Sequence, residues 1–260
     1  MLTKASLAPS FDGREGRSPP RRDGPRLRRR PFRARPVLAA TAVVITVAAL
    51  LAGCGGPGAN GEAGKAAGRI VTDAQKATMS ASSVHVSGSG TTTTTPLKLD
   101  LIAGPGRGGG TITSGTSVLN LILDKQSIYI KADAATIQSL SGNAATASRD
   151  ANKWLQTSST SSGFTGLSQL LDITRLPQSF TFGGVPAKQS ATTFAGMAVI
   201  PVFDPKSGGT LYVATTGKPY IIGIKGAKSN GGATLTFDHY GTAKVPSAPP
   251  NPITLPTTPG

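Results

Sequence analysis

The sequence predicts an α+β protein with a single curved antiparallel sheet of about ten strands and two or three helices on one face. From residue 82 onward, short segments alternate apolar and polar residues and are bounded by Gly, Pro and Asn, which is typical of strands joined by tight turns. Two other stretches, 62–81 and 164–176, repeat apolar residues every three or four positions, which favours amphipathic helices. A sheet of this size curls because its strands twist, so we expect the helices on its concave side.

The first predicted helix covers residues 62 to 81. Its apolar stripe is narrow and rich in alanine, and consists of Ala63, Ala66, Ile70, Ala74, Ala77 and Ala81. Small side chains allow a helix to pack close against a sheet, although they bury little area.

The next segments predict short antiparallel strands. They are 83–87 (continued by 91–95), 97–101, 110–113, 118–123 and 127–131. Leu97, Leu99 and Leu101 alternate with polar residues, so all three should lie on one face of the sheet. The links, such as 104–108 and 124–126, are short enough for a meander.

The middle of the chain interrupts this pattern. Residues 134–140 predict a short helix with Ile137 and Leu140 on one side. The helix over 164–176 has a larger apolar face and should end near Pro177. Further strands are predicted at 178–182, 187–194, 197–203, 210–215, 220–225 and 233–240. The Pro-rich residues 246–260 contain no aromatic side chain and predict a disordered tail.

The N-terminal stretch predicts export and lipid attachment. An arginine-rich segment precedes the apolar run 37–51, and Leu51, Ala52 and Gly53 stand before Cys54, the single cysteine of the chain. A basic region, an apolar region and small residues before a cleavage site make a secretory signal. Followed by cysteine, this pattern is a bacterial lipobox, so Cys54 should carry diacylglycerol and an N-acyl chain. The alternative is an uncleaved membrane anchor, since 37–53 is roughly 17 residues, the lower limit for a membrane span.

This interpretation divides the chain into four parts. Residues 1–53 are a signal peptide with a long basic N-terminal region, 54–61 a flexible Gly-rich tether, 62–245 the folded domain and 246–260 the tail. The domain would then lie outside the cytoplasm as a monomer, lipid-anchored to the cell membrane. The first 36 residues carry 11 Lys and Arg against three Asp and Glu, so about half of the formal charge of +15 belongs to the signal.

The composition excludes several kinds of chemistry. Few aromatic residues lie among the basic ones, which argues against nucleic-acid binding. His85 and His239 are far apart in the sequence, and neither has a partner at ligand spacing, so we expect no metal. Asp238 and Tyr240 flank His239 in a predicted strand, where neighbouring side chains point to opposite faces. We find no catalytic residues, and therefore expect no enzyme and no cofactor beyond bound or attached lipid.

Taken in order, these features resemble a known family. The resemblance covers about residues 62–246. It rests on the lipobox and on a series of short segments that follow it: 51–54, 82–88, 97–101, 128–131, 153–154, 167–171, 212–213 with Pro219, and 237–241. In this order and spacing, the chain resembles the actinobacterial lipoproteins of the LppX, LprA, LprF and LprG type. That resemblance implies a LolA-like antiparallel half-barrel with helices on its concave side. It also implies an apolar cavity that holds acyl chains of envelope lipids or glycolipids, with no catalytic residues.

The first functional hypothesis is therefore a membrane-anchored, non-enzymatic lipid carrier whose partners are the membrane, an envelope lipid and a membrane transporter. Alternation of apolar residues suggests the cavity lining: Leu99, Leu101, Leu119, Leu121, Ile128, Ile130, Trp154, Leu167, Leu171, Ile222 and Ile224. The alternative is a structural or signalling envelope protein with a filled core that acts through a membrane-protein partner. A hydrolase is a third hypothesis, but it would need an acid, a base and a nucleophile in one cleft.

Overall fold

The computed structural model describes residues 58–92, 95–161, 163–227 and 232–255, all of which belong to one unit. The predicted signal peptide and the lipobox residues Leu51, Ala52, Gly53 and Cys54 lie outside the described residues. In the part that is described, no helix has both the length and the apolar character needed to cross a membrane.

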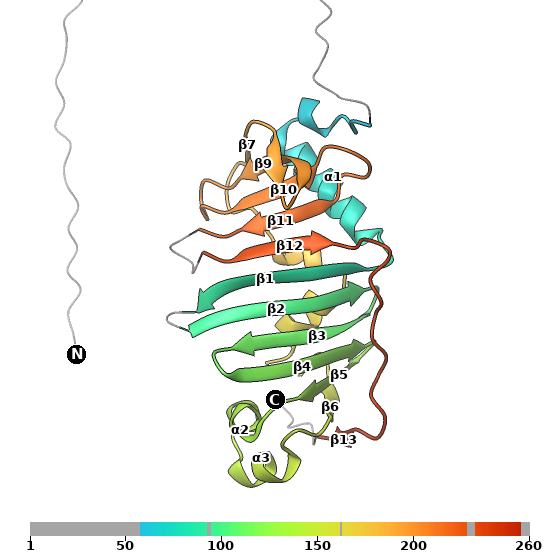
Figure 1. Cartoon of the computed structure of the whole chain (residues 1–260), viewed down its shortest axis with the longest axis vertical. Coiled ribbons are helices and arrows are strands. Elements are labelled where there is room, and N and C mark those ends of the chain that lie inside the picture. Colours follow the sequence, from blue (N-terminus) through green and yellow to red (C-terminus); the bar gives the residue numbers. More distant parts are fainter. Residues whose placement is uncertain (1–57, 93–94, 162, 228–231, 256–260) are drawn as a thin grey trace, which may run out of the picture. The chain divides into compact units, whose positions relative to one another are not determined.

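One open, curved sheet organises the unit (Figure 1). Its strands are β1 (Val84–Thr92), β2 (Thr95–Gly104), β3 (Arg107–Ser114), β4 (Ser117–Asp124), β5 (Ser127–Lys131), β6 (Leu155–Ser158), β7 (Ala187–Lys188), β8 (Thr192–Phe194), β9 (Met197–Phe203), β10 (Thr210–Ala214), β11 (Ile221–Lys225), β12 (Thr234–Asp238) and β13 (Ile253–Thr254). The order is β13-β6-β5-β4-β3-β2-β1-β12-β11-β10-β9-β7, and β8 also pairs with β9. All pairs are antiparallel except β13 with β6. The predicted fold class, a half-barrel with helices, is thus confirmed.

The helices are η1 (Glu62–Gly64), α1 (Ala67–Met79), α2 (Ala134–Ser141), α3 (Ala144–Asp150), α4 (Thr165–Leu171) and η2 (Leu176–Ser179). Of these, α2 and α3 pack against each other, whereas α1 and α4 pack on the sheet. In Figure 1, α4 and η2 lie behind the sheet. Here α4 packs on β2, β3 and β4, while α1 contacts β9, β10 and β11. This concave side holds the main hydrophobic core.

The close packing of α4 on the sheet depends on a glycine. A Cβ added at Gly108 in β3 would collide with the backbone oxygen of Leu171 at the end of α4. Directly after Leu171, the Asp172 carboxylate accepts a hydrogen bond from the Gly106 N–H at 3.1 Å, and the Ile173 N–H donates to the Gly104 carbonyl at 3.2 Å. The chain leaves the helix here to bind the β2–β3 turn, so α4 is shorter than the predicted 164–176 helix.

Three local predictions differ from the structure. Residues 178–182 are not a strand, because the chain turns through η2 at Pro177 and both Phe180 and Phe182 pack on the core. Strand β6 lies in a Ser- and Thr-rich region that gave no strand signal. In α2, Ile137 is buried in the core as expected, whereas Leu140 is 42% exposed and does not belong to the core.

The predicted disordered tail is wrong for residues 246–255. After β12 the chain runs along one side of the sheet to β6 (Figure 1). The Ile253 N–H donates to the Trp154 carbonyl at 2.8 Å, and the Leu255 N–H donates to the Gln156 carbonyl at 2.9 Å. Ile253 and Leu255 also pack against the core. An edge strand offers unpaired backbone groups, and β13 satisfies those of β6 in spite of the prolines around it.

The predicted flexible tether, 54–61, is also wrong in its second half. The Asn60 backbone N–H donates to the Thr215 carbonyl at 2.9 Å, and its side-chain amide donates to the Ala214 carbonyl at 2.9 Å. Ala59 forms a bridge with Thr216. Glycine content alone suggested flexibility, but these hydrogen bonds fix residues 58–61 to the end of β10. Residues 54–57 lie outside the described residues.

Candidate functional site

The concave face of the central strands has a covered half and an open half. Leu101 in β2 and Leu121 in β4, two strands on which α4 packs, are buried in the core, with exposed fractions of 2% and 1%. Two residues away on the same face, Leu99 and Leu119 are only half-buried. Side chains two apart on a strand share a face, so the difference comes from what lies above them and not from their orientation.

Six half-buried residues and one buried residue, Leu211, form a continuous row across seven strands, which we call the apolar row. Cross-strand pairing places its members in direct succession: Leu119, Ile112, Leu99, Gly88, Leu235, Ile224 and Leu211. Gly88 has no side chain, and Leu235 covers its position. Neighbouring strands lie about 4.8 Å apart, so the row is roughly 29 Å long. It thus provides an elongated apolar surface perpendicular to the strands.

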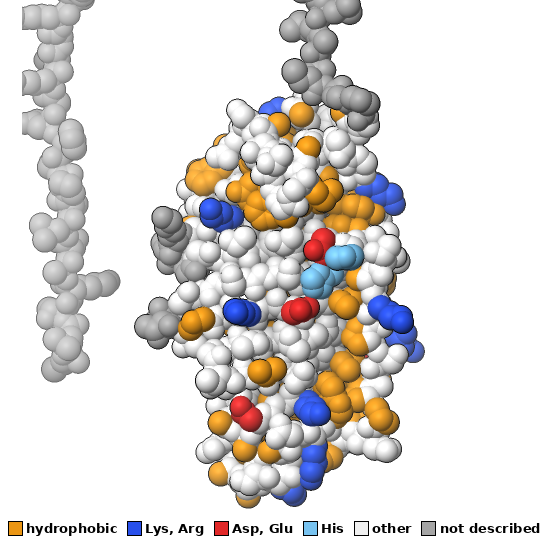
Figure 2. All heavy atoms as spheres, viewed as in Figure 1, with side chains coloured by type: hydrophobic (Ala, Val, Ile, Leu, Met, Phe, Trp, Pro, Cys, Tyr) orange, Lys and Arg blue, Asp and Glu red, His pale blue; other side chains and the backbone are white. Residues whose placement is uncertain are grey.

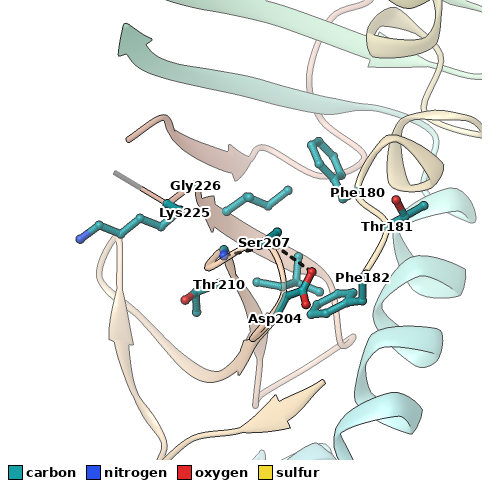
Figure 3. A pocket seen from close by; sticks show the side chains of 12 residues that line it. Phe180, Thr181, Phe182, Asp204, Ser207, Thr210, Lys225 and Gly226 are labelled. Atoms are coloured by element: carbon teal, nitrogen blue, oxygen red, sulfur yellow. Dashed lines mark hydrogen bonds between the residues drawn. The ribbon is translucent and has the colours of Figure 1, made fainter. Parts of the chain in front are cut away.

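A cavity of about 200 Å³ lies at the end of the apolar row. Leu211 and Ile224 belong both to the row and to the cavity wall. Phe180 and Phe182, from the segment after η2, form the opposite wall, as Figure 3 shows. An apolar cavity of about 150 Å³ is large enough for benzene, so this cavity has room for a short length of acyl chain.

Asp204 fixes the polar side of this cavity. Its carboxylate accepts hydrogen bonds from the Gly183 N–H at 2.9 Å, the Lys206 N–H at 3.0 Å and the Ser207 hydroxyl at 2.8 Å. These hydrogen bonds, chiefly the one from Gly183, lower the pKa of Asp204 below its usual value. Asp204 therefore joins the loop after β9 to the segment that carries Phe182. With its oxygens engaged in this way, it serves as part of the scaffold.

The eleven predicted lining residues do not all lie together. Five of them fill the core, namely Leu101, Leu121, Ile128, Ile130 and Leu171. Four are half-buried beside it, namely Leu99, Leu119, Leu167 and Ile224. Among the eleven, Ile224 alone contributes to the cavity described above.

The remaining two, Ile222 and Trp154, lie on the outer face. A β-bulge between β10 and β11 shifts the alternation, so that Ile221 faces the core and Ile222 packs with Val199 and Ala214. Trp154 precedes the fully buried Leu155 and lines an outer hollow together with Pro246. The structure therefore contradicts a role in the concave lining for these two residues.

Sequence reasoning also missed several members of the site. Ile112 and Leu235 fall in correctly predicted strands, and cross-strand pairing would have found them once the register was known. Phe180 and Phe182 fall in the segment 178–182, for which the sequence predicts a strand. Pro177 before them and Gly183 after them were the signals for a turn.

Neither histidine has a partner at ligand spacing in the sequence, but strand pairing brings ligand-type side chains to both. Strand β1 pairs with β12, with His85 opposite Asp238, and this brings His239 close as well. Burial lowers the pKa of His85, but hydrogen bonds with Asp238 and Asp100 outweigh burial and raise it. Figure 2 shows the two histidines (pale blue) beside acidic side chains (red) on the outer face. The cluster therefore lies on the opposite side of the sheet from the apolar row.

Comparison with solved structures finds similar folds. LprF from Mycobacterium bovis aligns with a TM-score of 0.48 and 17% identity, covering 72% of this chain and 97% of that chain. The lipoprotein LppX from Mycobacterium tuberculosis aligns with a TM-score of 0.40 and 13% identity, covering 68% and 95%. A conserved protein from Thermus thermophilus aligns with a TM-score of 0.39 and 7% identity, covering 73% and 98%. No family model and no curated protein sequence matches the chain.

LprF and LppX are two of the lipoprotein types that the sequence resembles. What this chain binds is inferred from its own residues, above all from the apolar row and the cavity beside it.

Proposed function

We propose that this protein is an extracytoplasmic lipoprotein that binds acyl chains of envelope lipids or glycolipids and carries or presents them without catalysis. Diacylglycerol on Cys54 would attach it to the cell membrane, and a membrane transporter would be its exchange partner. The observation that carries the proposal is the apolar row, which crosses seven strands, is half-buried except at Leu211 and ends at a cavity.

The dimensions of the site suggest how a lipid would lie. The cavity, at about 200 Å³, is smaller than the roughly 300–1,000 Å³ typical of pockets that enclose a whole ligand. We therefore place one end of an acyl chain in the cavity and the rest along the row. Burial of apolar area, at about 25 cal/mol per Å², would supply most of the affinity.

A direct test is native mass spectrometry of the lipoprotein expressed from the full sequence in an actinobacterial host and purified in mild detergent. We expect bound lipid that Leu119→Asn removes and Val118→Asn retains. Val118 is the neighbouring residue in β4, points to the outer face and is 42% exposed, so the pair differs mainly in the face that is altered. If no lipid is bound, or if both variants lose it equally, the proposal fails.

The alternative, an envelope protein with a filled core, also has an observation in its favour. Five of the predicted lining residues are fully packed inside. If it holds, the chain would bind no lipid, and an affinity pull-down from host membranes would recover a specific membrane protein. The lipid measurement above separates the two.

A further inference from the structure

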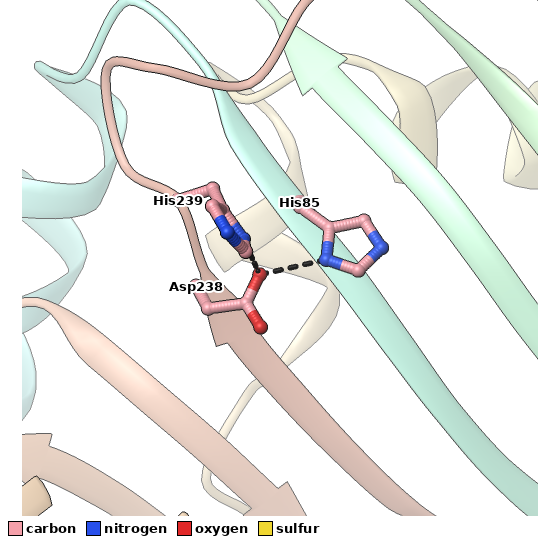
Figure 4. Close-up of side chains that lie close together, drawn as sticks. All are labelled: His85, Asp238 and His239. Atoms are coloured by element: carbon pink, nitrogen blue, oxygen red, sulfur yellow. Dashed lines mark hydrogen bonds and ion pairs between the residues drawn. The ribbon is translucent and has the colours of Figure 1, made fainter.

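Three side chains with metal-binding atoms meet on the outer face of the sheet. His85 lies in β1, Asp238 is the last residue of β12, and His239 follows it (Figure 4). Successive residues of a strand point to opposite faces, but the strand ends at Asp238 and His239 has a left-handed backbone with φ of 50°. This turn returns the His239 ring to the side of Asp238.

The donor atoms converge on one point. The Nδ1 atoms of His85 and His239 each lie 2.7 Å from the same Oδ1 atom of Asp238. The two ring centroids are 5.8 Å apart with an interplanar angle of 67°, so the rings approach the carboxylate from different directions. One ligand atom from each residue falls within 4.8 Å of the others. A single cation at this point could reach all three residues after small side-chain rotations.

A fourth residue supports the arrangement. The Asp100 Oδ1 atom, in β2, lies 3.1 Å from Nε2 of His85. To bind a metal through Nδ1, a neutral imidazole must carry its proton on Nε2, and Asp100 is placed to accept a hydrogen bond from that proton. Metal-bound histidines commonly donate their other N–H to a carboxylate in this way, which fixes the tautomer and the ring orientation.

We propose that His85, Asp238 and His239 form a binding site for a transition-metal cation, best suited to Zn²⁺, with Asp100 as a positioning residue for His85. Two imidazoles and one carboxylate suit Zn²⁺, whereas Mg²⁺ and Ca²⁺ prefer oxygen ligands throughout. Three protein ligands leave one tetrahedral position for water or an exogenous ligand. His239 is 67% exposed, so the site is open to exchange with solvent.

The ion would join β1, β12 and the turn after β12. It would lie on the face opposite to the apolar row, since His85 alternates with the buried core residue Val86. The proposal therefore stands independently of lipid binding.

The test uses the full chain in detergent, without a polyhistidine tag. The chain has two histidines, so the imidazole region of a ¹H–¹⁵N spectrum reports on each ring separately. On titration with ZnCl₂ we expect both rings to shift together and to saturate at one equivalent, while MgCl₂ leaves them unchanged. Rings that respond separately, respond equally to Mg²⁺, or do not respond would overturn the proposal.

Variants complete the test through calorimetric titration with ZnCl₂. His239→Asn removes a ligand but keeps a residue that tolerates a left-handed backbone, so the fold should be retained. We expect it to weaken binding at least tenfold, and Asp100→Asn to weaken it by about 10- to 100-fold. Asp124→Asn, a carboxylate paired with Arg107 on another part of the sheet, is the matched control and should bind as the parent does. Equal Zn²⁺ affinity in His239→Asn and the control would contradict the assignment of His239 as a ligand. If a variant fails to fold, the spectra of the parent chain decide whether the metal site exists.

Discussion

The two halves of the concave face contain similar leucines with different surroundings. Leu101 and Leu121 are part of the core, on strands against which α4 packs, while Leu99 and Leu119, on the same strands and the same face, are half-buried. Sequence alternation treats all four alike. The difference shows that the covering element, not the strand, decides whether an apolar residue stabilises the fold or remains available to a ligand.

The largest expected effect comes from the covered half. Leu121→Ala should lower the free energy of unfolding by about 2–5 kcal/mol, because it leaves a cavity beneath α4. Leu119→Ala should cost clearly less in stability, since that side chain is only half-buried, and should reduce lipid uptake instead. Urea unfolding of both variants checks this. Equal losses of stability in the two variants would contradict the distinction between the covered half and the open half of the concave face.

A second prediction concerns α4, the helix that covers one half of the concave face. Gly108→Ala should destabilise the protein by about 1–3 kcal/mol, since its Cβ collides with the end of α4 and forces that helix off the sheet. Increased binding of a hydrophobic dye would show that the covered half has become accessible.

The matched control for that variant is Gly166→Ala, within α4. A Cβ at Gly166 meets nothing within 4 Å, so the change should be neutral or stabilise the helix by about 0.5–1 kcal/mol. If the two variants unfold at the same urea concentration, close contact at Gly108 is not what holds α4.

A smaller, pH-dependent effect is expected at the cavity wall. The pKa of Asp204 is lowered in the folded protein, so its contribution to stability is complete above its ordinary value of about 3.9 and is lost as the pH falls through the folded pKa. Asp204→Asn should therefore flatten the decline of melting temperature on the acid side of pH 4. Asp124→Asn serves as the control. If the melting temperature of Asp204→Asn falls on the acid side of pH 4 as steeply as that of the parent, the role given to the Asp204 carboxylate is wrong.

A further prediction concerns attachment to the membrane and involves neither half of the concave face. Cys54→Ala should release the domain from membranes or leave its precursor uncleaved, with no change in unfolding, because residue 54 precedes the first residues that dock on β10. Membrane fractionation and immunoblotting check this. A variant that stays processed and membrane-bound would contradict the lipobox.

Much of the fold could be predicted from local pattern. The meander from β1 to β5 follows from alternating residues and short turns, and α1 follows from the Ile70 and Ala74 stripe. Contacts between distant segments could not be predicted in this way. The β-bulge that turns Ile222 outward, the pairing of Ile253 beside Leu155, and the meeting of His85 with Asp238 all depend on tertiary register. One residue of shift exchanges the faces of a strand, so alternation alone selects candidates for a site but not their side of the sheet.

We expect an acyl chain to lie on the open half of the concave face and not within the covered half. A fatty acid with a photoactivatable diazirine on its chain, crosslinked to the full protein and mapped by mass spectrometry, tests this directly. We expect crosslinks at Leu99, Ile112 and Leu119 and at Phe180 or Phe182, with Leu101 and Leu121 unlabelled. Labelling confined to the outer face, or no labelling above that of the Leu119→Asn variant, would contradict it.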